Sequence, residues 1–99
     1  MSKNQKQIKK VAKLLNSRET KEYLINVKAN FDNGKVIRKQ NVDVFEAQLL
    51  YSKLHRQKGF CNLEVYAHAY RRKTKSWLTE LATLETDEDF FCFFRSVEI

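Results

Sequence analysis

The chain has 99 residues, of which 42% are hydrophobic and 12% aromatic, and it carries a formal net charge of +7 at pH 7. This length indicates a single domain over residues 1–99, and the aliphatic and aromatic content excludes an intrinsically disordered chain. No apolar run approaches the roughly 18 residues of a membrane-spanning helix, so we expect no membrane partner. The basic N-terminus is followed by no apolar leader, and two cysteines are too few for a disulfide framework, which together indicate a cytoplasmic protein.

Positive charge is concentrated in the first three quarters of the chain. Residues 1–75 contain 18 of the 19 lysines and arginines but only 6 of the 12 acidic residues, a net charge of +12, whereas residues 76–99 have a net charge of −5. A continuous cationic stretch of this kind is typical of a surface that meets a polyanion. The charge distribution therefore favours nucleic acid as the partner.

The first part of the chain predicts a helix followed by a strand. Residues 4–16 place apolar side chains at helical spacing and lysines on the remaining arc, which predicts an amphipathic helix. Residues 22–31 alternate between apolar and polar side chains, which predicts a strand with one buried face.

A hairpin is predicted where Asn33 and Gly34 follow this strand. The Asn-Gly pair favours a two-residue type I′ turn, because both positions need a positive φ, and the return strand is predicted over residues 36–42. Such a turn would place Lys28 opposite Lys39. Directly opposed like charges destabilise a sheet, so this pair needs either a bound anion or separation into water.

The next element is a second helix. Asp43 can cap its N-terminus, and Glu46 three residues later completes a capping-box pattern. The helix is expected to continue to about Lys58, with Gly59 directly after its end.

Three elements are predicted in the last part of the chain. Residues 60–72 alternate and predict a third strand. Residues 76–86 fit a helix or a strand, and we favour a strand because the third strand needs a hairpin partner; a helix would remove the fourth strand. Thr86 and Asp89 resemble a capping box for a short final helix. The order α-β-β-α-β-β-α predicts an α+β fold, a four-stranded antiparallel sheet with helices on one face.

A polar and aromatic stripe on the third predicted strand is the main candidate site. Tyr66, His68, Tyr70 and Arg72 alternate with apolar residues and therefore share one face. If the helices cover the apolar face, these aromatic rings look outward, where they can stack unpaired bases. The alternative interpretation is structural, since tyrosine is a good strand former with a polar end.

Cations from the hairpins extend this candidate site. The connection Arg71–Lys75 holds four cations in five residues, which suits a phosphate grip but is also typical of a solvated hairpin tip. The leading hypothesis is a small nucleic-acid-binding protein, with RNA or single strands favoured over duplex DNA. Its predicted binding residues are Lys28, Arg38, Lys39, Tyr66, His68, Tyr70, Arg71, Arg72, Lys73 and Lys75.

No metal site, cofactor or enzymatic centre is expected. The two histidines and two cysteines match no zinc-binding spacing, and Cys61 lies in an apolar alternation that predicts core packing. A ribonuclease is the third hypothesis, because His68 lies between two tyrosines and can act as a general acid or base.

The acidic, Phe-rich C-terminal segment supports the second hypothesis. Phe91, Phe93 and Phe94 either close the core or form a docking face for a protein partner or a second copy of the chain. By analogy only, small catalytically empty proteins of this size include phage and mobile-element inhibitors or adaptors that act on a host protein.

Overall fold

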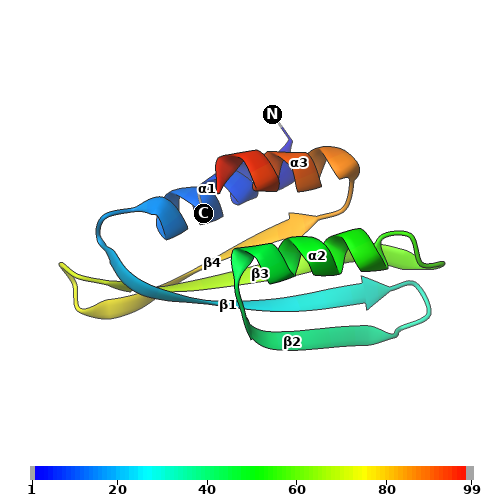
Figure 1. The fold of residues 1–99 in the computed structure, drawn as a ribbon, viewed down its shortest axis with the longest axis horizontal. Helices are drawn as coiled ribbons and strands as arrows, with labels where there is room; N and C mark the ends of the chain where they lie inside the picture. Colours follow the sequence, from blue (N-terminus) through cyan, green and yellow to red (C-terminus); the bar gives the residue numbers. More distant parts are fainter. Residues whose placement is uncertain (1, 98–99) are drawn as a thin grey trace.

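The computed structural model describes residues 2–97. These residues form, in chain order, α1 (Lys3–Asn16), β1 (Thr20–Phe31), β2 (Val36–Val42), α2 (Val44–Leu54), β3 (Phe60–Arg71), β4 (Ser76–Leu84) and α3 (Asp87–Ser96). The strands make one open antiparallel sheet in the order β2-β1-β3-β4, and the three helices of this part of the chain all lie on one side of it (Figure 1). The predicted α+β fold is confirmed, including the strand within 76–86. No helix in residues 2–97 is long and apolar enough to span a membrane.

The alternation along β3 explains why the helices gather on one side. The side chains of Leu63, Val65, Ala67 and Ala69 point to the helices and are 0% exposed, whereas the residues between them are half-buried. Helix α1 packs against β3 and β4. Because the two alanines are small, the helix can approach the sheet closely, and burial of its apolar stripe provides most of the driving force for this packing.

The turn between β1 and β2 is one residue longer than predicted. The Gly34 N–H donates to the Phe31 carbonyl at 3.1 Å, and the Phe31 N–H donates to the Lys35 carbonyl at 3.0 Å. Gly34 has a φ of +84°, so three residues form a type I turn that ends in a left-handed glycine, as in a G1 bulge. The type I′ prediction is wrong because only the glycine, and not Asn33, adopts a positive φ.

The longer turn shifts the β1–β2 register by one residue. Lys28 pairs with Arg38, and Lys39 pairs with Val27, so the predicted Lys28–Lys39 pair is wrong. The side chain of Val27 is buried on the helix side at 2% exposure. Lys39 therefore belongs to the helix side of this edge strand, and Arg38 takes its place beside Lys28 on the opposite side.

Helix α2 begins as predicted and ends earlier. The Asp43 carboxylate accepts a hydrogen bond from the Glu46 N–H at 2.7 Å, which confirms the N-cap. The helix ends at Leu54 rather than near Lys58, because the chain must turn back toward the β1–β2 hairpin. There the Gly59 carbonyl accepts a hydrogen bond from the Asp32 N–H of the hairpin at 2.8 Å. Gly59 has a φ of +85°, and a Cβ at this position would lie 2.5 Å from a carboxylate oxygen of Asp32.

The capping box of α3 also ties this helix to α1. Asp89 is 4% exposed, and its Oδ2 accepts hydrogen bonds from the Asn4 side chain at 3.0 Å and from the Glu85 N–H at 3.0 Å. The same oxygen lies 3.3 Å from the Thr86 N–H, and the Thr86 hydroxyl accepts from the Asp89 N–H at 3.2 Å. The predicted capping box is confirmed. A single buried carboxylate thus stabilises the helix start and the α1–α3 packing together.

We predict that Asp89→Ala lowers the free energy of unfolding by roughly 2–3 kcal/mol, because one hydrogen bond to a buried charged group contributes about 1.5–3 kcal/mol and bonds that share one oxygen do not add. Urea unfolding followed by circular dichroism measures the change. Asp87→Ala is the matched control, since the Asp87 side chain, in the same helix, is 72% exposed; its effect should stay below roughly 0.5 kcal/mol. Equal losses in the two variants would contradict the prediction.

Candidate nucleic-acid interface

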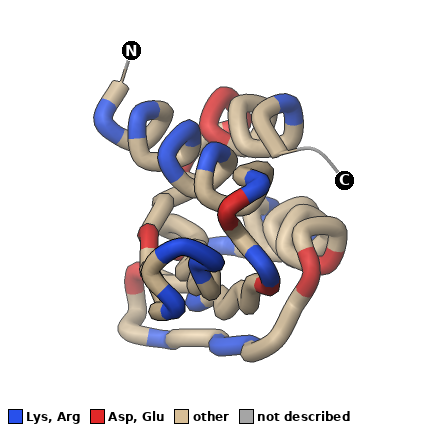
Figure 2. The backbone as a smooth tube through the Cα atoms, turned by 90° about the vertical axis from the view of Figure 1, so that its left-hand side faces the viewer, with Lys and Arg blue, Asp and Glu red and all other residues tan. Residues whose placement is uncertain are grey.

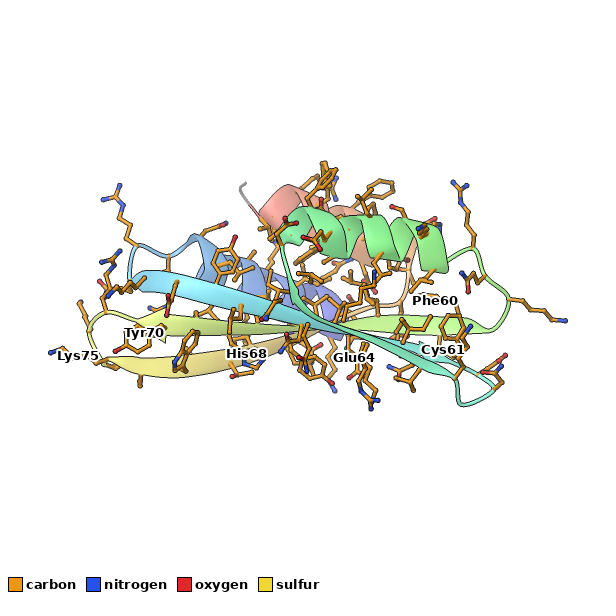
Figure 3. All side chains as sticks on the ribbon, turned by 60° about the horizontal axis from the view of Figure 1, so that its bottom comes forward. Phe60, Cys61, Glu64, His68, Tyr70 and Lys75 are labelled. Atoms are coloured by element: carbon orange, nitrogen blue, oxygen red, sulfur yellow. The ribbon has the colours of Figure 1, made fainter. Side chains whose placement is uncertain are left out.

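The side of the sheet that no described helix covers is here named the open face. Figure 3 turns it toward the viewer and labels Glu64, His68 and Tyr70 along β3. The register places the following side chains on it: Glu22, Leu24, Asn26, Lys28 and Asn30 from β1, Arg38 from β2, Asn62, Glu64, Tyr66, His68 and Tyr70 from β3, and Trp77, Thr79, Leu81 and Thr83 from β4. The outward direction of the tyrosine stripe therefore follows from the fold.

Aromatic side chains occupy the end of the open face nearest the β3–β4 hairpin. Tyr70 and Trp77 are register partners whose rings lie edge to face, with centroids 5.5 Å apart. Trp77 is 48% exposed. His68 lies one row further along and shares a 2.8 Å hydrogen bond between its Nδ1 and the Thr79 Oγ1. These residues form an aromatic zone that is accessible to a planar ligand.

Trp77 was not among the predicted site residues. Its segment fitted a helix as well as a strand, and only the strand assignment places the tryptophan beside Tyr70. The signal was nevertheless available: in a hairpin closed by residues 72–75, Tyr70 and Trp77 fall opposite each other and share a face.

The other end of the open face carries a hydrogen-bonded polar network. The Asn30 amide donates to the Glu64 Oε1 at 2.7 Å and to the Asn62 Oδ1 at 2.8 Å. The Tyr66 hydroxyl donates to the Glu64 Oε2 at 3.1 Å. Burial raises the pKa of Tyr66 above its ordinary value, the hydrogen bond and negative charge of Glu64 raise it further, and Arg38 opposes these effects. Tyr66 therefore stays protonated and acts as a donor.

Two cations lie in the same row of the sheet as Glu64. Lys28 and Arg38 are register partners, and together with Asn26, Gln40 and Tyr66 they line a shallow depression on the open face. The depression lies at an irregularity of the β1–β2 pairing, which a bulge in the ladder produces. Three of the predicted binding residues, Lys28, Arg38 and Tyr66, thus lie together around this depression.

Lys39 does not join this group on the open face. It borders the depression at the edge of the sheet, but by register its side chain leaves on the helix side. There it lines a second depression with Glu46 and Lys53 of α2.

The basic hairpin tip packs against the connection between α1 and β1. The Arg71 guanidinium donates to the Thr20 hydroxyl at 3.3 Å, and by register Arg71 lies on the helix side. Lys73 forms a 3.9 Å ion pair with Glu19, and its side chain is 81% exposed. Arg72 and Lys75 are also exposed. Figure 2 views this end of the molecule and shows lysines and arginines on the hairpin and along α1, with acidic residues among them.

A second accessible surface lies on the helix side. Phe91 and Phe94 of α3 are each 54% exposed, whereas Phe93 is 0% exposed, so the expectation that Phe93 forms a docking face is wrong: its position on α3 faces the core. Phe45 and Leu49 of α2 are 58% and 53% exposed and were missed. They lie one helical turn apart, outside the apolar stripe that contacts the sheet. We call these four residues the helix-side patch.

The cysteines and histidines lie apart. Asn62 and Phe60 pair with two consecutive residues of β1, so Cys61 between them is the unpaired extra residue of a bulge. Cys61 is therefore exposed rather than in the core. Cys92 is buried in α3. His55 stacks on a tyrosine ring at the end of α2, on the helix side. Within residues 2–97, no group of three or more His, Cys, Asp or Glu side chains is placed to hold a metal ion.

We predict that Glu64→Gln lowers the pKa of Tyr66, because a neighbouring carboxylate disfavours the phenolate and its removal favours ionisation. Carbon-13 NMR of labelled tyrosine, titrated with pH, measures this pKa. Glu22→Gln is the control, since Glu22 is an acid of the same face that pairs with Tyr70 instead, and it should leave Tyr66 unchanged. A Tyr66 pKa that stays constant or rises in Glu64→Gln would show that the hydrogen bond does not form in solution.

Comparisons with protein-family models, with curated proteins and with solved structures found no match to this chain. The functional inference is therefore carried by the residues of the open face and of the helix side themselves.

Proposed function

We propose that the protein binds single-stranded nucleic acid, with RNA favoured, through the open face. The observation that carries the proposal is the aromatic zone, in which Tyr70 and Trp77 lie in contact on an uncovered sheet surface. Tyr66 continues this zone along the same strand, two residues from His68. An exposed sheet with aromatic side chains suits bases that are splayed out of a helix, whereas duplex DNA is more often bound by a helix in the major groove.

Stacking supplies the sequence-independent part of the affinity. Each base that stacks on an aromatic side chain contributes roughly 1–3 kcal/mol. Trp77 offers the largest ring system on this face and is half-exposed without a ligand, so covering it with a base also removes apolar surface from water.

Cations supply the contacts to phosphates. Lys28 and Arg38 lie on the open face beside Tyr66, and Arg72, Lys73 and Lys75 extend the positive charge beyond the aromatic zone. The two paired cations repel each other in the free protein, and a bound phosphate would offset this repulsion. Such contacts release counterions from the nucleic acid, so affinity falls as salt increases.

We propose binding without catalysis, in the cytoplasm, where the free thiols of Cys61 and Cys92 would remain reduced. His68 is the histidine of the open face, and its Nδ1 is engaged by Thr79. A ribonuclease would normally need a second group that transfers protons near this histidine.

The helix-side patch favours a second candidate function, a non-enzymatic inhibitor or adaptor that binds a protein. Large apolar side chains that are more than half exposed, here on α2 and on α3, are typical of protein interfaces. An origin in a phage or mobile element remains an analogy with other small inhibitors. The two candidates use opposite sides of the sheet, so substitutions separate them.

We predict that Trp77→Ala weakens binding of a single-stranded RNA decamer by roughly 5- to 150-fold, the loss expected for one stacked base. Fluorescence anisotropy at fixed salt measures the change. Phe91→Ala is the matched control, because it also removes a half-exposed aromatic ring, 54% exposed, but from the helix side. If Phe91→Ala weakens binding and Trp77→Ala does not, the open face is not the interface.

We further predict that the double variant Lys28→Gln/Arg38→Gln reduces the slope of log affinity against log salt by about 1.4, because each lost phosphate contact on a single strand contributes about 0.7. Salt titrations of the wild type and the variant provide both slopes. Lys53→Gln removes a cation of α2 on the helix side and should leave the slope unchanged. If the slopes of all three proteins agree, Lys28 and Arg38 do not contact phosphates.

A further inference from the structure

Glu64 is an unexpected residue on the proposed binding surface. It lies near the middle of β3, where it pairs with Lys28 of β1 and with Thr83 of β4. A carboxylate repels phosphates, so it weakens the general attraction for a polyanion. Acidic side chains in nucleic-acid interfaces instead accept hydrogen bonds from base N–H groups.

We propose that the Glu64 carboxylate selects a guanine base on the open face. The inference rests on the proposed function, and it names the base that one position of the surface would accept.

The carboxylate is held in a fixed orientation. Its Oε1 accepts from the Asn30 amide at 2.7 Å and its Oε2 accepts from the Tyr66 hydroxyl at 3.1 Å. A carboxylate has about four lone-pair sites, so each oxygen retains one further site. Glu64 is half-buried rather than covered. A carboxylate with one free site on each oxygen can accept two parallel donors, as it does in bidentate pairs.

Guanine is the base whose pairing edge matches two adjacent acceptors. Its Watson–Crick edge presents the N1–H and the N2 amino group side by side, and both are donors. Adenine and cytosine place a ring-nitrogen acceptor beside their amino group, and that acceptor is repelled by a carboxylate oxygen. Uracil presents one N–H between two carbonyl oxygens. An unpaired base can offer this edge to a protein.

The surroundings of Glu64 suit a nucleotide. The Tyr66 ring lies next along the strand and can stack a base, and the depression that it lines with Lys28 and Arg38 can hold a phosphate. Stacking and phosphate contacts act on every nucleotide, whereas the carboxylate acts on one base. These three contacts together would convert general binding into a preference.

Uridine decamers labelled with fluorescein and carrying one central substitution test the proposal by anisotropy. The guanosine decamer should bind roughly tenfold more tightly than the all-uridine, adenosine and cytidine decamers, within the usual discrimination of a bidentate contact. Inosine lacks the N2 amino group and keeps every other pairing atom of guanine, so the inosine decamer should lose this advantage. 7-Deazaguanosine is altered only on the opposite edge and should bind like guanosine.

Glu64→Gln tests the residue itself. The amide has one acceptor in place of two, so the variant should bind the guanosine and inosine decamers equally while it retains affinity for the uridine decamer. Glu22→Gln removes a charge from the same face beside Tyr70 and should keep the guanosine preference.

The outcomes separate the two proposals. If the wild type binds all decamers equally with a normal salt slope, the guanine proposal is overturned and the proposed function stands. A guanosine preference that persists in Glu64→Gln overturns the assignment to this residue. If no decamer binds even at low salt, the proposed function fails, and the guanine proposal fails with it.

Discussion

The alternation along β3 is the constraint on which the rest of the molecule depends. Every second residue from Leu63 to Ala69 is apolar and completely buried, and the residues between them are polar or aromatic. Helices can bury their apolar stripes only against the first set, so the helices of residues 2–97 collect on one side. The other side of the sheet stays uncovered as a result, and the remaining residues of β3 project from it as part of the open face.

The type of side chain on the open face changes along the strands. Aromatic side chains lie near the β3–β4 hairpin, and amides and a carboxylate lie toward the other end, where Lys28 and Arg38 share a row with Glu64. On the proposed function, the aromatic side chains and the cations would attract any nucleotide, whereas the Glu64 carboxylate would discriminate between bases. The opposite side of the sheet carries a different kind of accessible surface, apolar and helical, and therefore suits a different class of partner.

Much of the fold and half of the site could be predicted because they depend on local patterns. Period-two alternation identified the strands, helical spacing identified α1, and Asp43 and Thr86 marked helix starts correctly. The outward direction of Tyr66, His68 and Tyr70 followed from the same alternation. The residues that were misplaced depend on single-residue shifts: Lys39 through the longer turn, Cys61 through the bulge in β3, and Phe93 through the rotation of a short helix.

The sequence by itself determined the order of the elements, the strongly cationic composition and the face on which the tyrosines lie, because each of these follows from neighbours a few residues apart. Only the tertiary structure decided that Arg38 rather than Lys39 joins Lys28, that Trp77 meets Tyr70, and that Asn30 orients Glu64. These pairings join different strands. Their register is set by turn geometry and by bulges, where a shift of one residue moves a side chain to the other face.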